Sequence, residues 1–173
     1  MTDADEVDRI AAAWARERPD VDLSPLHVLS RVTRLARHLD RARRAAFTEH
    51  GLEAGEFDVL AALRRSGPPY EQSPGRLGTW TMVTSGTMTA RLDKLEGRGL
   101  VSRRTDPDDG RAVIVALTPA GSDVVGAALV SLLEQEHALL APVSSDDQLR
   151  LAELLRAILV PLDGTTAIDR PQG

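Results

Sequence analysis

The fold of this chain is decided by the stretch Thr84-Ser-Gly-Thr-Met-Thr-Ala-Arg-Leu-Asp-Lys-Leu-Glu-Gly-Arg-Gly99. Thr84 is a polar residue of the kind that caps a helix, and Gly97 and Gly99 are typical of a helix end. Three apolar residues recur at helical spacing between these signals: Met88, Leu92 and Leu95. The stretch therefore predicts an amphipathic helix that packs one face on a core.

The opposite face of this predicted helix is small and polar. Gly86 and Ala90 lie between hydroxyl-bearing and cationic residues on that face. A face of this kind lets a helix lie deep in the major groove of DNA, where hydroxyl groups and cations reach base edges and phosphates. We expect DNA contacts from five side chains: Thr84, Ser85, Thr87, Thr89 and Lys94. Ala90 offers no polar contact, so operator preference does not follow from the pattern.

A β-hairpin is predicted directly after this helix. Apolar runs at 100–102 and 112–117 flank the turn Asp106-Pro-Asp-Asp-Gly-Arg111. Cations at the base and tip of a protruding hairpin suit phosphates or the minor groove of DNA, and here they are Arg103, Arg104 and Arg111. The turn is acidic, and Asp109 is expected to orient Arg111 by an ion pair. Residues 76–111 hold seven Lys and Arg against five Asp and Glu, although the whole chain has a net charge of −5.

Three motifs carry a resemblance to a known family. They are Ser85-Gly-Thr-Met-Thr-x-Arg-Leu-Asp-x-Leu-Glu-x-Arg-Gly-Leu-Val-x-Arg103, Asp106-Pro-Asp-Asp-x-Arg111 and Leu117-Thr-Pro-Ala-Gly121. They resemble the winged helix-turn-helix of the MarR family of bacterial transcriptional regulators, and the resemblance covers roughly residues 23–162. It implies a homodimer bound to a palindromic operator in double-stranded DNA. Each subunit then places a recognition helix in a major groove and a wing in the flanking minor groove.

The predicted fold class is mainly α with a small β-wing, a winged helix-turn-helix with long terminal dimerisation helices. Helices are expected at 3–18, with Asp3 as the cap, and at 25–50, 54–65, 119–140 and 146–162. The first helix of the DNA-binding pair is expected within 74–82, with Leu77 and Trp80 in the core. The predicted segments are an extra N-terminal helix (1–19), a dimerisation and ligand helix (20–52), the DNA-binding domain (53–118), C-terminal dimerisation helices (119–162) and a disordered tail (163–173).

The leucine-rich helices after the wing indicate dimerisation. Apolar residues nearly encircle the segment 124–140, which is too apolar for a small monomer. A two-fold axis would set the two recognition helices about 34 Å apart and predict an inverted-repeat operator. Packing within one chain is the alternative explanation of the same pattern.

Composition and the chain's start exclude several classes of protein. The chain has no cysteine, its four histidines lack metal-ligand spacing, and it shows neither a Gly-rich phosphate loop nor a serine-nucleophile motif. We therefore expect no enzyme activity, no cofactor and no metal. The start Met1-Thr-Asp-Ala-Asp-Glu6 has no signal-peptide pattern, and no apolar run reaches membrane-spanning length. A cytoplasmic protein is expected, associated with the bacterial nucleoid when bound to DNA and with no membrane partner.

Two charged residues of the predicted helix 54–65 suggest an effector site. Asp58 and Arg65 lie on one face but about 10 Å apart along the axis, so they do not pair easily with each other. Arg91, at the edge of the apolar stripe of the recognition helix, is placed to turn inward and pair with Asp58. Arg65 is then left to bind an anion. The alternatives are unrelated surface ion pairs for Asp58 and Arg65, and a phosphate contact for Arg91.

These residues extend the resemblance to the urate-responsive, PecS-like branch of the family. Trp14 in Ala-Trp-Ala-Arg16, Asp58, Arg65 and Arg91 fill the matching positions. The resemblance implies that Trp14 and Arg65 bind a planar purine anion, that Asp58 is displaced, and that Arg91 transmits the movement to DNA. A small anionic effector such as urate would then release the repressor. Two other functions stay open: the same DNA binding with an aromatic or polycarboxylic acid effector, such as a phenolate, citrate or aconitate, and a nonspecific architectural DNA-binding protein.

Overall fold

The structure is a computed structural model that describes residues 4–107 and 109–168, with side chains as far as 163. Its contacts divide the chain into a first unit, Met1–Gln135, and a second unit, Glu136–Gly173. Most of the predicted helix 119–140 therefore belongs with the DNA-binding domain. Among the described residues, no single helix is long and apolar enough to cross a membrane.

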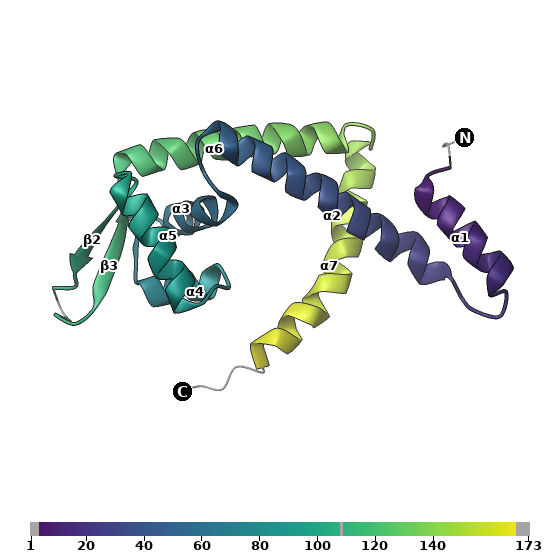
Figure 1. Ribbon diagram of the computed structural model, residues 1–173, viewed down its shortest axis with the longest axis horizontal. Helices are drawn as coiled ribbons and strands as arrows, with labels where there is room; N and C mark the ends of the chain where they lie inside the picture. Colours follow the sequence, from purple (N-terminus) through teal and green to yellow (C-terminus); the bar gives the residue numbers. More distant parts are fainter. Residues whose placement is uncertain (1–3, 108, 169–173) are drawn as a thin grey trace. The chain divides into compact units, whose positions relative to one another are not determined.

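The elements follow the order that the sequence predicts, with one additional strand. They are α1 (Glu6–Glu17), α2 (Ser24–Glu49), α3 (Ala54–Arg65), β1 (Glu71–Gln72), α4 (Pro74–Trp80), α5 (Ser85–Gly97), β2 (Val101–Thr105), β3 (Val113–Leu117), α6 (Pro119–Leu140) and α7 (Ser145–Ile168). The predicted fold class, mainly α with a small β-wing, is confirmed. In Figure 1 the hairpin of β2 and β3 projects beside α5, and α1 lies at the opposite end of α2 from these winged-helix elements.

The wing is an antiparallel sheet in the order β1-β3-β2. Arg103 pairs with Val115 across β2 and β3, and Glu71 pairs with Ala116 across β1 and β3. Strand β1 is not predicted from the sequence, because two residues are too few to show strand alternation. This short strand ties the segment before α4 to the wing.

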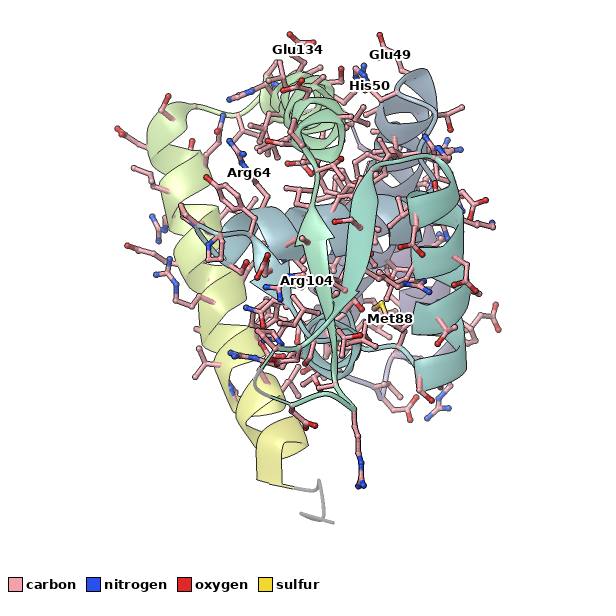
Figure 2. All side chains as sticks on the ribbon, turned by 90° about the vertical axis from the view of Figure 1, so that its left-hand side faces the viewer. Glu49, His50, Arg64, Met88, Arg104 and Glu134 are labelled. Atoms are coloured by element: carbon pink, nitrogen blue, oxygen red, sulfur yellow. The ribbon has the colours of Figure 1, made fainter. Side chains whose placement is uncertain are left out.

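The core of the first unit is built around α3. Val59, Leu60, Ala62 and Leu63 are fully covered there. The apolar face of α5 covers them, and in Figure 2 Met88 points inward from that helix. Burying each large aliphatic side chain contributes about 1.5–3 kcal/mol, so these two faces fix α5 against α3.

Helix α6 begins in close contact with the turn before the wing. A β-carbon added at Gly121 would lie 2.9 Å from the carbonyl carbon of Leu100 and closer still to its oxygen, so only glycine fits there. The ring nitrogen Nε2 of His50 lies 2.8 Å from Ser131 Oγ, and Arg64 donates to Ser122. Arg64 and His50 are labelled in Figure 2. These contacts join the start and the middle of α6 to the ends of α3 and α2, respectively.

Helix α1 is held on α2 by one arginine. Arg31 of α2 donates to Asp5 and Asp8 at 2.8 and 2.7 Å, while Val7 and Ala11 are buried. The Arg31 guanidinium holds the pKa of Asp8 below its ordinary value. Hydrogen bonding from the Asp8 backbone N–H, and then from Arg31, does the same for the pKa of Asp5.

The ends of two helices differ from the prediction. Asp5 caps α1 because its carboxylate accepts from the backbone N–H groups of Val7 and Asp8. The expected cap, Asp3, lies outside the described residues. Helix α7 continues to Ile168, past the predicted start of the tail at 163. Residues 169–173 of that predicted tail also lie outside the described part.

Large apolar side chains remain exposed on three helices of the single chain. They include Leu29, Val32 and Leu35 of α2, Leu129 and Leu133 of α6, and Leu149, Leu154, Ile158 and Leu159 of α7. The α2 residues Leu29, Val32 and Leu35 recur every three residues on one side of the helix, which a single chain leaves uncovered. Exposed apolar surface of this extent is typical of a protein interface.

Candidate nucleic-acid interface and effector site

The first turn of α5 presents hydroxyl groups to solvent. Thr84 caps the helix, since its hydroxyl oxygen accepts from the backbone N–H of Thr87 at 3.4 Å and lies 3.0 Å from the Thr87 hydroxyl. Thr89 donates to the carbonyl oxygen of Ser85 at 3.0 Å. All four residues are exposed, on the side away from the buried Met88. The structure therefore exposes these hydroxyl groups in the first turn of α5, where the sequence predicts contacts with base edges.

A second face of α5 is turned toward the start of α3. Lys94 donates to Glu53 at 2.9 Å, which raises the pKa of Lys94. One turn further, Arg98 donates to Glu56 at 3.2 Å, and the residue Glu56 is only 4% exposed. Glu56 also accepts from the backbone N–H of Glu53 at 2.9 Å, so this buried carboxylate is satisfied. A DNA contact by Lys94, as the sequence predicts, requires Lys94 to exchange Glu53 for a phosphate.

Two of the predicted DNA-binding arginines of the wing also form ion pairs within the chain. Arg103 lies 2.7 Å from Asp93 and 3.7 Å from Glu96, and its side chain is 25% exposed. Arg104 lies 2.7 Å from Glu71. In Figure 2 Arg104 lies alongside the hairpin. In this structure Arg103 anchors the wing to α5 and Arg104 anchors it to β1.

Arg111 at the tip of the wing is differently placed. The residue is exposed, and Asp109 accepts its backbone N–H at 3.1 Å. No Arg111–Asp109 ion pair within 4.0 Å occurs in the described part of the chain, so Asp109 shapes the turn instead of orienting the guanidinium as predicted. Of the three predicted wing cations, Arg111 is the one that extends from the end of the hairpin.

Arg91 turns from α5 toward the first turn of α3. A β-carbon added at Gly55 would overlap the Arg91 guanidinium, so this glycine provides the space that the guanidinium occupies. Asp58 follows Gly55 by three residues on the same face of α3. No Arg91–Asp58 ion pair within 4.0 Å is present among the described residues. The Arg91 guanidinium therefore lies beside Gly55 and does not form the predicted ion pair with Asp58 in this structure.

Arg65 and Trp14 line different hollows. Arg65 lines a hollow of about 310 Å³ together with Ala62 and Trp80. Trp14 is 52% exposed and lines one of about 280 Å³ with other residues of α1. Figure 1 shows α1 far from α3. Within one chain, therefore, the structure does not bring Trp14 to Asp58 and Arg65.

Trp80 does not lie in the core, where the sequence predicted it. The residue is 42% exposed, and the Arg76 guanidinium lies 5.1 Å from the centre of its ring. Leu77 and Gly78 are the buried residues of the seven-residue α4. The missed signal is the spacing of Arg76 and Trp80, because residues four apart share a helix face and a cation favours an indole surface. Among residues 4–107 and 109–163, no cluster of His, Asp and Glu side chains suits a metal ion.

Comparison with known proteins identifies the family. The model of the MarR family matches residues 52–113. The transcriptional regulator PecS of Dickeya dadantii is 37% identical over 150 residues, which cover 87% of this chain and 90% of PecS. This chain belongs to the MarR family. As a MarR-family protein with this winged helix, it is a DNA-binding transcriptional regulator.

Two solved structures of MarR-family regulators show the same fold. A cysteine-to-serine mutant of MarR from E. coli, in complex with operator DNA, has a TM-score of 0.65 and 25% identity, covering 80% of this chain and 99% of that chain. Bordetella bronchiseptica BpsR has a TM-score of 0.59 and 26% identity, covering 75% of this chain and 93% of that chain. The BpsR structure concerns regulation of its DNA binding by 6-hydroxynicotinic acid.

Proposed function

We propose that this MarR-family regulator is a homodimeric repressor that a small planar anion releases from an inverted-repeat operator. Urate or a related purine catabolite is the leading effector, because the resemblance to the urate-responsive branch rests on Trp14, Asp58, Arg65 and Arg91. The observation that carries the proposal is the position of Arg91 over Gly55. It connects the recognition helix to the face of α3 that bears Asp58 and Arg65.

The physical argument for release is a competition between charges. An anion beside Arg65 repels the Asp58 carboxylate, which lies on the same helix face. A change at Asp58 alters the environment of the Arg91 guanidinium, which lies beside Gly55, one helical turn before Asp58 on α3. An effector that binds the DNA-free conformation tenfold better shifts the equilibrium by about 1.4 kcal/mol per site. Two sites in a dimer would double that shift.

The dimer is supported by the exposed apolar side chains of α2, α6 and α7. A second copy of the chain would cover them and would place two α5 helices on one operator. Trp14 is kept as a predicted effector residue. Since α1 lies away from α3 within one chain, its contribution would come from α1 of the other subunit.

A second candidate keeps the DNA binding and changes the effector to an aromatic or polycarboxylic acid. The observation that favours it is the 6-hydroxynicotinic acid described for BpsR, which is a planar heteroaromatic acid. Nonspecific architectural binding is the remaining alternative, and it predicts no preference for a palindrome.

The test uses the full chain and fluorescent duplexes that carry the palindrome found beside its gene. Fluorescence anisotropy should show tighter binding to this duplex than to a scrambled one of equal composition. Urate should release the complex, whereas citrate at equal ionic strength should not. Equal affinity for both duplexes would reject sequence-specific binding. Release by an aromatic acid or by citrate, but not by urate, would select the second candidate.

A further inference from the structure

The hollow beside Arg65 contains an indole that the sequence analysis assigned to the core. Trp80 is the last residue of α4 and is 42% exposed. Ala62 and Arg65 of α3 face it across the hollow, three residues apart on one side of that helix. At about 310 Å³, the hollow lies at the lower end of the range of ligand pockets, roughly 300–1,000 Å³.

The charges around this indole favour an anion. Arg76 lies 5.1 Å from the centre of the Trp80 ring. Among the ion pairs of the described residues, none includes Arg65 or Arg76. Two guanidinium groups without a carboxylate therefore flank one aromatic ring.

We infer that Trp80 supplies the aromatic surface of the effector site and stacks on a planar anion whose charged edge is bound by Arg65. An indole face attracts flat conjugated rings, and a guanidinium binds carboxylate or enolate oxygens through paired N–H donors. Ala62 leaves room for the ring between them. The inference rests on the proposed effector release and names the aromatic residue of that site.

Trp80 lies close in sequence to the predicted recognition helix α5. Trp80 precedes the helix cap Thr84 by four residues, and the connection contains Met82 in a left-handed conformation with φ of 53°. Helix α4 also packs on α5. A ligand that contacts Trp80 therefore acts on the element that leads directly into the recognition helix.

The two tryptophans of the chain allow a direct test. In Trp14→Phe protein only Trp80 fluoresces, and in Trp80→Phe protein only Trp14 does. Each is titrated with urate, and N-acetyltryptophanamide corrects for absorption by urate itself. We expect saturable quenching in Trp14→Phe protein, where Trp80 alone reports; absence of quenching there would exclude contact between urate and Trp80. We also expect Trp80→Leu to raise the urate concentration for half-release of the operator by about tenfold. Operator affinity without urate is measured for each protein, and release is compared at equal starting occupancy of the operator.

The outcomes separate this inference from the proposed function. Saturable quenching of Trp14 alone, or release of the Trp80→Leu and Trp80→Phe complexes at the wild-type urate concentration, overturns the role of Trp80 and leaves effector release standing. Quenching of Trp80 without any release of operator overturns the proposed function and keeps the site. Absence of both quenching and release in the wild-type protein overturns both. Circular dichroism of each variant establishes that it is folded.

Discussion

Gly55 of α3 leaves open the space that the Arg91 guanidinium of α5 fills. The two residues join α3, which carries the candidate effector residues Asp58 and Arg65, to α5, the predicted recognition helix. Because the overlapping atoms are the end of a flexible side chain, a methyl group at position 55 displaces Arg91 without disturbing either backbone. A substitution at position 55 therefore tests the position of the Arg91 side chain separately from the stability of the fold.

Gly55→Ala should weaken operator binding by about three- to tenfold, because it moves Arg91 away from the start of α3. The free energy of unfolding should stay equal or rise by up to about 1 kcal/mol, since alanine favours a helix over glycine. Anisotropy titrations and urea unfolding measure the two quantities. Gly75→Ala is the matched control, because Gly75 is likewise the second residue of a helix and has open space around its β-carbon position. Equal operator affinity in all three proteins would refute a role for the placement of Arg91.

Gly121→Ala should destabilise the protein by about 1–3 kcal/mol, the usual cost of overpacking. The added methyl group meets the backbone carbonyl of Leu100, which has little freedom to move. Gly126→Ala on the same helix meets nothing within 4 Å and should be neutral or slightly stabilising. Urea midpoints for the two variants check this prediction, and a similar loss for both would mean that the contact with Leu100 is unimportant.

Arg111→Ala should weaken operator binding several-fold and reduce the dependence of log affinity on log salt by about one. Its stability should be unchanged, because the residue is exposed at the wing tip. Arg103→Ala should instead lower the free energy of unfolding by up to about 1 kcal/mol, since it removes the ion pairs with the exposed carboxylates of Asp93 and Glu96. Titrations at several salt concentrations and denaturant unfolding distinguish the two arginines. A wild-type salt dependence in the Arg111 variant would remove the wing tip from the interface.

Arg31→Gln should loosen α1, because Arg31 binds both Asp5 and Asp8. Hydrogen exchange of the α1 amides should become faster while that of α3 stays unchanged. Arg41→Gln is the control on the same helix, since Arg41 contacts only His38 of its own helix among the hydrogen bonds of the described residues. Slow exchange of α1 in the Arg31 variant would show that Val7 and Ala11 suffice to hold it.

The same contact sets an expected pH dependence. The pKa values of Asp5 and Asp8 are lowered from 3.8 in the folded chain. Their contribution is therefore present above the ordinary carboxyl pKa and is lost as pH falls through the lowered folded values. Protection of the α1 amides, taken relative to the intrinsic exchange rate at each pH, should hold at neutral pH and fall only in strong acid. A loss of protection already above pH 5, well above the ordinary carboxyl pKa near 4, would contradict the assignment.

The sequence predicted the elements whose signals are local. Helix α3 has the predicted bounds, and α5 begins after the Thr84 cap with Met88 on its buried face. The partners of Lys94 and Arg103 lie on other segments or other helix turns, and their pairing depends on how the elements pack. Trp80 was misplaced because seven residues of α4 are too few to define a buried face by periodicity. Gly55 carries no sequence signal at all, since its role exists only once α5 crosses α3.

The carboxylates beside Lys94, Arg103 and Arg104 have a consequence for how the regulator moves through the cell. Cations that are already paired with carboxylates of the protein displace few condensed counterions from DNA of arbitrary sequence. The acidic protein therefore gains little affinity for nonspecific genomic DNA. Few copies are then sequestered away from the operator, and the search for it stays rapid. In the proposed complex, discrimination would fall to the hydroxyl groups in the first turn of α5 and to Arg111 at the tip of the wing.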